Sequence, residues 1–136
     1  MDKALNYVAL ARKAGRIELG EEPVGAATRA QHARLVIVAS DASDHTWRRA
    51  LSFVSGTEQK CIRIPFTKDQ LGQAIGRTAL AIAAFTDAAL AVAFAKALPQ
   101  PDPALLAVLE QKATRIAQRQ KEAKAHQRNK RTGKNK

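Results

Sequence analysis

The sequence predicts an α/β fold: a three-layer α/β/α sandwich with a small mixed sheet, followed by a basic C-terminal tail that is helical or disordered. Short apolar runs of strand length alternate with stretches that have the helical period, and the connections between them are short. The chain has 136 residues, enough for one domain with a buried core. Hydrophobic residues make up 46% of it but aromatic residues only 4%, so we expect a core of alanine, valine, leucine and isoleucine.

The N-terminal part is predicted to form a helix, a strand and a second helix over residues 4–14, 17–19 and 20–31. Gly15 suits the end of the first helix because glycine reaches the left-handed conformation without a Cβ clash. The second helix opens on a glycine, two acids that favour its positive end, and a proline where no amide donor is required. Backbone N–H groups at such a start can contact an anion or a nucleic acid. These residues are Gly20, Glu21, Glu22 and Pro23.

Strands and helices are predicted to alternate up to residue 98. The further strands are expected at residues 35–39, 61–64 and 79–85. The first and last of these are continuous apolar runs, typical of strands covered on both faces. Helices are expected after each strand: one is capped from within residues 41–44, one by Thr67 with Gln70 in a capping box, and one by Asp87.

A change in composition divides the chain into a domain, residues 1–98, and a basic C-terminal extension, residues 99–136. The prolines of residues 99–103 mark the boundary. Apolar residues up to Ile116 predict a helix that still contacts the domain, and no large apolar residue follows Ile116. The extension is therefore predicted to be helical at first and disordered at its end.

The net charge is +11, and the tail carries most of it. Residues 1–100 have 13 basic and nine acidic side chains, whereas residues 101–136 have ten basic and three acidic ones. A polyanionic partner is the natural expectation, because each neutralised phosphate releases counterions. The alternative for the tail is a solubilising extension. The tail cations expected to contact RNA are Arg119, Lys121, Lys124, Arg128, Lys130 and Arg131.

Catalytic and metal-binding patterns are weak. His32, His45 and His126 are scattered without metal-ligand spacing, and Cys61 stands alone in an apolar setting that suggests a buried strand residue. No phosphate-binding loop, signal-peptide pattern or membrane-length apolar run is present in the sequence. We therefore expect a cytoplasmic protein that is not an enzyme, with no metal, cofactor, small-molecule substrate or membrane partner.

Two further sets of polar side chains are candidates for nucleic-acid contact. One set is close in sequence to the helix start at Gly20, and the other follows a later helix. Three cations are expected beside Gly20, and an arginine and a threonine are expected in a loop between a helix and a strand. Cations next to a potential anion site suggest nucleic-acid contact, whereas isolated charges are usually solvated surface. These candidates are Arg12, Lys13, Arg16, Arg77 and Thr78.

Four segments resemble, in order and spacing, the ribosomal protein L-seven-Ae-like superfamily of kink-turn RNA-binding proteins, and in particular its short bacterial YlxQ-type members. The segments are LARKAG at residues 10–15, GEE at 20–22, LVIVASDA at 35–42 and LGQAIG at 71–76. The resemblance covers roughly residues 3–98. It implies an α/β/α sandwich that binds structured RNA.

In that superfamily, the start of the second helix enters a kinked RNA helix and the loop after the LGxAxG segment covers extruded bases. The resemblance places the helix start at Gly20, Glu21, Glu22 and Pro23, and the covering loop at Arg77, Thr78 and Ala79. The chain departs from the superfamily by having Glu22 for asparagine, Pro23 for glutamate and Ala26 for lysine, although YlxQ-type members also tend to carry two glutamates there. A carboxylate at Glu22 cannot donate the hydrogen bonds of an amide.

The sequence thus predicts a non-enzymatic RNA-binding protein associated with the ribosome or another ribonucleoprotein. Structured RNA, ribosomal RNA included, is the expected partner, with ribosomal proteins as further candidates. One alternative is a protein-interaction module that uses the acidic Glu21–Glu22 edge, with the tail as a nonspecific tether. Another is an enzyme-associated domain, since related folds serve as substrate-binding portions of RNA methyltransferases; it would require a catalytic domain in addition to these residues.

Overall fold

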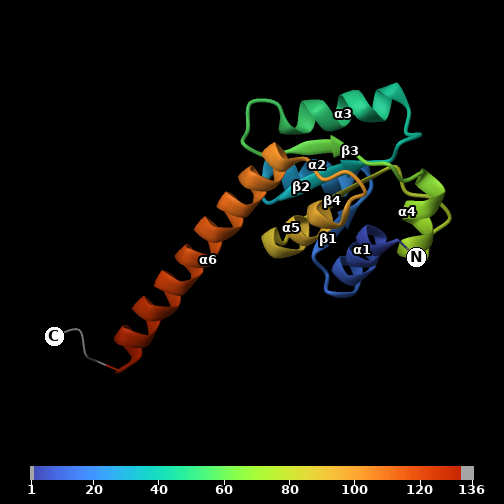
Figure 1. Ribbon diagram of the computed structural model, residues 1–136. Coiled ribbons are helices and arrows are strands. Elements are labelled where there is room, and N and C mark those ends of the chain that lie inside the picture. Colours follow the sequence, from blue (N-terminus) through green and yellow to red (C-terminus); the bar gives the residue numbers. More distant parts are fainter. Residues whose placement is uncertain (1, 133–136) are drawn as a thin grey trace.

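The computed structural model describes residues 2–132, with side chains described up to residue 127, and shows helices on both faces of a four-stranded sheet (Figure 1). The helices are α1 (Lys3–Lys13), α2 (Glu21–Arg29), α3 (Asp44–Val54), α4 (Lys68–Ala74), α5 (Ala88–Ala97) and α6 (Pro103–Thr132). The strands are β1 (Ile17–Leu19), β2 (Leu35–Val38), β3 (Cys61–Arg63) and β4 (Ile82–Phe85). The predicted α/β fold is confirmed.

The sheet is mixed and has the strand order β1-β4-β2-β3. The last strand in the chain, β4, lies between β1 and β2 and is antiparallel to both, whereas β3 is parallel to β2. Phe85 is the register partner of both Ile17 and Leu35. Every residue of the two central strands, β2 and β4, is buried, as the sequence predicts from their continuous apolar runs.

Two layers of helices enclose this sheet. On one face α2 packs against α3, and on the other α1 packs against α4 and α5 (Figure 1). Phe85 of β4 meets Phe94 of α5 with their ring centroids 5.0 Å apart, and this contact packs the sheet against α5. The rest of the core is mostly alanine and branched aliphatic side chains, which agrees with the low aromatic content.

The last strand is shorter than the sequence predicts. A strand is expected from residue 79, but β4 begins at Ile82. The preceding residues bond to α4 instead: Arg77 N–H donates to the Gly72 carbonyl at 2.8 Å, and Leu80 N–H donates to the Lys68 carbonyl at 2.9 Å. These bonds make the segment a loop over α4 rather than part of the sheet.

The capping side chains expected at two helix starts are confirmed. Thr67 and Gln70 form the reciprocal capping box of α4, and the Asp87 carboxylate accepts from Leu90 N–H at the start of α5. Within residues 41–44, it is Ser43 that caps α3. Asp41 instead accepts from Lys68 N–H at 2.8 Å and joins the end of β2 to α4.

The helix α6 is fixed to the domain at its N-terminal end and then projects away from it (Figure 1). Leu109 is 3% exposed in the core, and Lys96 and Glu110 pair α5 with α6 at 3.2 Å. The helix continues past Ile116, the last large apolar residue, through the final described position. Residues 133–136, part of the predicted disordered end, lie outside the described residues.

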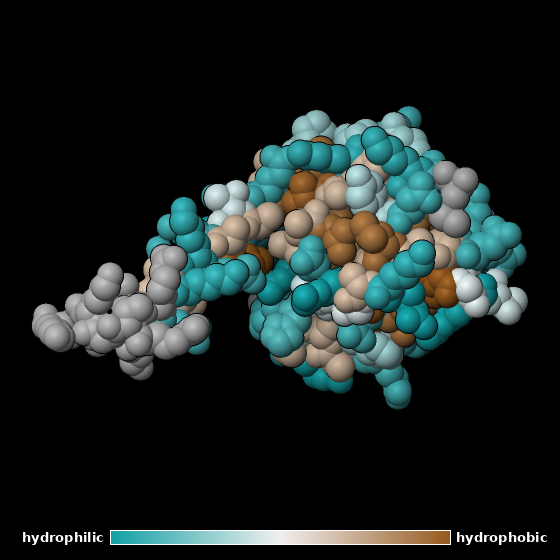
Figure 2. Space-filling model, turned by 90° about the horizontal axis from the view of Figure 1, so that it is seen from below, coloured by the Kyte–Doolittle hydropathy of each residue, from teal (hydrophilic) through white to brown (hydrophobic). Residues whose placement is uncertain are grey.

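Apolar surface gathers on the globular part of the molecule, broken by hydrophilic side chains (Figure 2). The large hydrophobic side chains that stay exposed among the described residues are Leu10 and Leu51. Among the described helices, none combines the length and the apolar character needed to cross a membrane.

Replacing Leu109 with alanine tests the anchor of α6. Leu109→Ala opens a cavity in the core and should lower the free energy of unfolding by about 2–4 kcal/mol, measured by urea denaturation. Leu51→Ala is the matched control, because its side chain is 43% exposed; it should cost less than about 1 kcal/mol. Equal costs for the two variants would show that α6 is not held by Leu109.

Candidate nucleic-acid interface

The start of α2 presents two free backbone donors. Gly20 is its N-cap residue at φ +95°, a conformation that L side chains rarely adopt. Gly20 N–H donates to the Ile82 carbonyl at 3.0 Å, which ties the helix start to the first residue of β4. Pro23 has no N–H, so the N–H groups of this positive helix end that have no acceptor among the described residues are those of Glu21 and Glu22.

The two acids at this start lie in different environments. Glu21 faces α3: its Oε1 lies 3.9 Å from Arg49 Nε, and that oxygen is buried with no hydrogen-bond partner among the described residues. The Arg49 guanidinium also covers the Phe53 ring at 5.1 Å from its centroid. Glu22 is exposed. The edge that looks doubly acidic in the sequence therefore presents one free carboxylate and one that faces an arginine.

The Arg77 loop lies at the same end of the sheet as Gly20. The loop leads directly into β4, whose first residue accepts the Gly20 hydrogen bond. Arg77, Thr78 and Ala79 are all exposed. The loop can cross α4 closely because Gly72 has no side chain: a Cβ there would lie 2.7 Å from Ala79 Cα. The structure thus brings the helix start and the predicted covering loop to one end of the fold.

The three cations expected beside Gly20 are not found there. Arg16 precedes β1, and its carbonyl accepts from Thr86 N–H at 2.9 Å, directly after Phe85. Arg12 and Lys13 lie in the last turn of α1, just before Arg16. The extended strand β1, about 10 Å long, separates this group from Gly20. Proximity in sequence was misleading here because a strand carries the chain from one end of the sheet to the other.

A groove of about 470 Å³ nevertheless connects the two ends along α2 and the edge strand β1. Pro23 and Ala26 line it from α2, the exposed Glu18 lines it from β1, and Arg16, His32 and Arg34 line it from the opposite end. Sequence reasoning missed Arg34. Its N–H donates to the Phe85 carbonyl at 2.7 Å, and that bond, invisible until β2 is known to pair with β4, brings it next to Arg16.

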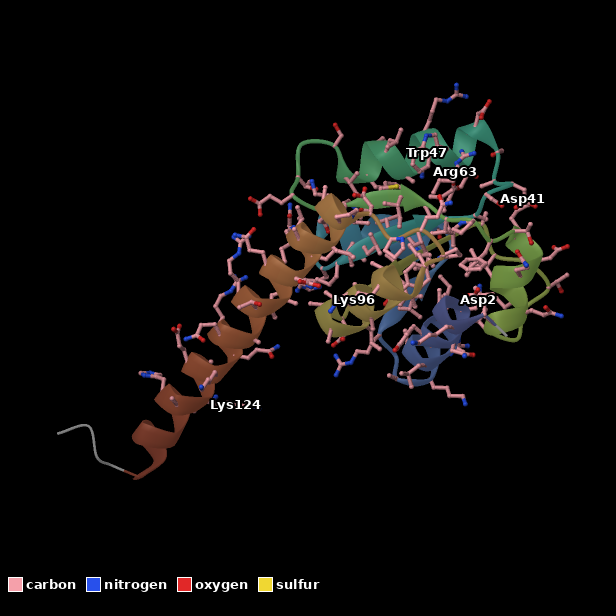
Figure 3. The ribbon with its side chains drawn as sticks, viewed as in Figure 1. Asp2, Asp41, Trp47, Arg63, Lys96 and Lys124 are labelled. Carbon is pink, nitrogen blue, oxygen red and sulfur yellow. The ribbon has the colours of Figure 1, made fainter. Side chains whose placement is uncertain are left out.

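The tail cations divide between two faces of α6. Arg119 lines a second cavity together with Lys112 and Arg115. Lys121 is nine residues from Lys112, so it lies about 180° around the helix, and Lys124 lies nearer to Lys121 than to this cavity side. Lys124 is on the part of α6 that projects from the domain (Figure 3). The side chains of the remaining candidates, Arg128, Lys130 and Arg131, lie outside those described.

Cys61 is poorly suited to be a nucleophile. It is half-buried in β3, and burial raises the pKa of its thiol from 9.0 to about 11, an effect that the nearby Arg63 charge partly opposes. Among the described residues no group of three or more His, Cys, Asp or Glu side chains could hold a metal ion.

The raised thiol pKa predicts slow alkylation of Cys61. At pH 8 the folded protein should react with iodoacetamide about 100-fold more slowly than the urea-unfolded protein, because the thiolate fraction falls tenfold per pKa unit. Its rate should rise about tenfold per pH unit from pH 7 to 10, whereas the rate of the unfolded chain levels off above pH 9. A folded-state rate that levels off with the unfolded one would contradict the raised pKa.

Substitution of Gly72 tests the support of the Arg77 loop. Gly72→Ala places a Cβ against the Ala79 backbone and should cost about 2–3 kcal/mol of unfolding free energy. It should also speed amide exchange at Arg77 and Leu80, whose N–H groups bond to α4. Gly15→Ala is the control, because a Cβ at Gly15 would meet no atom within 4 Å. Its left-handed backbone should make this variant about 1 kcal/mol less stable without affecting the loop. Unchanged exchange in Gly72→Ala would show that the loop does not depend on this contact.

Comparison with known proteins gives one curated relative and several similar structures. RNA-binding protein YlxQ of Enterococcus faecium is 36% identical over 75 residues, which are 55% of this chain and 72% of the relative. A protein of unknown function from Bacillus halodurans has a TM-score of 0.62 at 25% identity, over 81% of this chain and 99% of its own. A 15.5 kD RNA-binding protein of Giardia lamblia has a TM-score of 0.55 at 19% identity, over 85% of each chain. No protein-family model matches the chain.

These similarities agree with the α/β/α sandwich. They confirm the resemblance to the ribosomal protein L-seven-Ae-like superfamily of α/β proteins. Within that superfamily, the chain belongs to the YlxQ family.

Proposed function

We propose that this protein binds structured RNA without catalysing a reaction, through the start of α2 and the Arg77 loop. The observation that supports this most is the juxtaposition at one end of the sheet of two free helix N–H groups, from Glu21 and Glu22, and the exposed Arg77. The names of the curated relative and of the Giardia protein support the choice of RNA as the ligand.

The polar groups at the Gly20 end of the sheet favour contacts with the RNA backbone over hydrogen bonds to base edges. Two N–H groups at a positive helix end can donate to phosphate oxygens, and the Arg77 guanidinium can make a bidentate contact. The Glu22 carboxylate only accepts hydrogen bonds, so it offers no donor to a base edge. Docking would therefore depend on RNA shape, and the cations of α6 would add salt-sensitive affinity.

We place this activity in the cytoplasm, on the ribosome or another ribonucleoprotein, with ribosomal RNA and ribosomal proteins as candidate partners. The alternative of a protein-interaction module requires a strongly acidic edge. Arg49 Nε lies 3.9 Å from Glu21 Oε1, and its positive charge offsets part of the negative charge that a basic protein partner would meet at this helix start. This contact favours RNA over a basic protein.

Fluorescence anisotropy with two labelled RNAs tests the proposal. The probes are an RNA hairpin that contains a kink-turn and a continuous RNA duplex of the same length. Wild-type protein should bind, and Arg77→Gln should weaken binding several-fold and reduce the slope of log affinity against log salt by about 1. Arg48→Gln on α3 removes one exposed charge elsewhere and should change the affinity less than about twofold.

Two results would contradict this function. One is the absence of binding by the wild-type protein to both RNAs at low salt, where phosphate contacts are strongest. The other is an Arg77→Gln variant that cannot be distinguished from Arg48→Gln, which would remove the Arg77 loop from the interface.

A further inference from the structure

A polar cavity lies at the end of the sheet opposite Gly20. It has a volume of about 570 Å³ and is bounded by the loop before β2, the loop before β3 and one side of α6. Four cations line it, together with one acid, Glu58. The cations are Arg34, Lys112, Arg115 and Arg119.

Hydrogen bonds fix the walls of this cavity. The buried Gln59 side chain accepts from Ala33 N–H and donates to the Thr28 carbonyl, each at 3.0 Å, and so joins the two loops. Lys112 Nζ donates to the Glu58 carbonyl at 2.7 Å and joins α6 to the second loop. These hydrogen bonds hold the two loops and α6 together, so the shape of the cavity does not depend on flexible side chains alone.

The charges around Lys112 do not balance. Burial lowers the pKa of Lys112, and the positive charges of Lys60, Arg115 and Arg34 lower it further, while Glu58 raises it. The arginines keep their charge at any physiological pH. A bound anion would relieve this repulsion, and the guanidinium groups match phosphate geometry.

The cavity and the groove beside α2 share one lining residue. Arg34 lines both, so Arg16, Arg34 and the cations of α6 follow one another around this end of the fold, and Glu18 is the one acid among the described residues that line the groove beside them. On α6, Lys112, Arg115 and Arg119 are three and four residues apart and share one helical face. This face turns toward the domain, and the positions of Lys121 and Lys124 lie away from it.

We propose that this cavity is a second RNA-docking site, which binds backbone phosphates at the end of the sheet opposite Gly20. The inference rests on the proposed RNA-binding function and extends it: one RNA would contact both ends of the fold along the groove of Arg16 and Arg34. In this arrangement α6 is a structural part of the RNA-binding surface, and its charges act at fixed positions.

Two double variants of the full chain, each with two charges removed from the same helix, test this proposal. Arg115→Gln with Arg119→Gln removes cations that line the cavity, and Lys121→Gln with Lys124→Gln is the matched control. All four side chains are exposed, so folding should be unaffected, and circular dichroism checks it. Binding of the kink-turn hairpin and of the RNA duplex is measured at several salt concentrations.

The cavity variant should lose about tenfold in affinity, and its salt slope should fall by about 2, one for each lost phosphate contact. The control should lose less than about threefold. Equal losses in both variants would overturn the proposal, since the tail would then act as diffuse charge. A loss of poly-glutamate binding as large as the loss of RNA binding would also overturn it, by showing a general anion site.

The same measurements separate this proposal from the proposed function. Wild-type protein that binds neither RNA overturns both. Loss of binding in Arg77→Gln, with no difference between the two double variants, overturns the cavity alone. Full affinity in Arg77→Gln, with loss confined to the cavity variant, supports the cavity and overturns the proposed interface at the Arg77 loop.

Discussion

The antiparallel pairing of β4 with both β1 and β2 is the constraint on which the rest of the structure depends. Because Phe85 pairs with Ile17 and with Leu35, one end of β4 gathers Arg16 and Arg34. The other end holds the start of α2 through Ile82 and receives the Arg77 loop. The strand thus determines which polar groups share each end of the molecule, and both proposed RNA contacts follow from it.

Local patterns were sufficient to predict the elements and the fold class, but the arrangement of the strands came only from the structure. The helical period, the apolar runs and the helix caps made by Thr67 and Asp87 each involve residues that are close together in the sequence. The insertion of β4 between β1 and β2 depends on contacts distant in sequence. Local sequence therefore places Arg16 beside Gly20 and does not identify Arg34 as a site residue.

The distribution of charge at the candidate site also could not be predicted from the sequence alone. Glu21 and Glu22 are adjacent and equivalent in the sequence, and only the packing of α3, which brings Arg49, makes them different. The tail reads as one block of positive charge, yet the helical period of α6 puts Lys112 and Lys121 on opposite faces. The composition shows that the net charge of the chain is positive, and only the tertiary structure shows which faces of the molecule carry that charge.

The attachment of α6 at one end has a consequence for the entropy of association. The packed turns around Leu109 supply the costly nucleus of the helix, so the solvated turns beyond Ile116 need only propagate it. From Ile116 to Thr132 the helix advances about 24 Å, at 1.5 Å per residue. A flexible tail would lose conformational freedom at each contact with a partner, whereas a helical arm has already lost it on folding. More of its charge–phosphate attraction is then available as affinity.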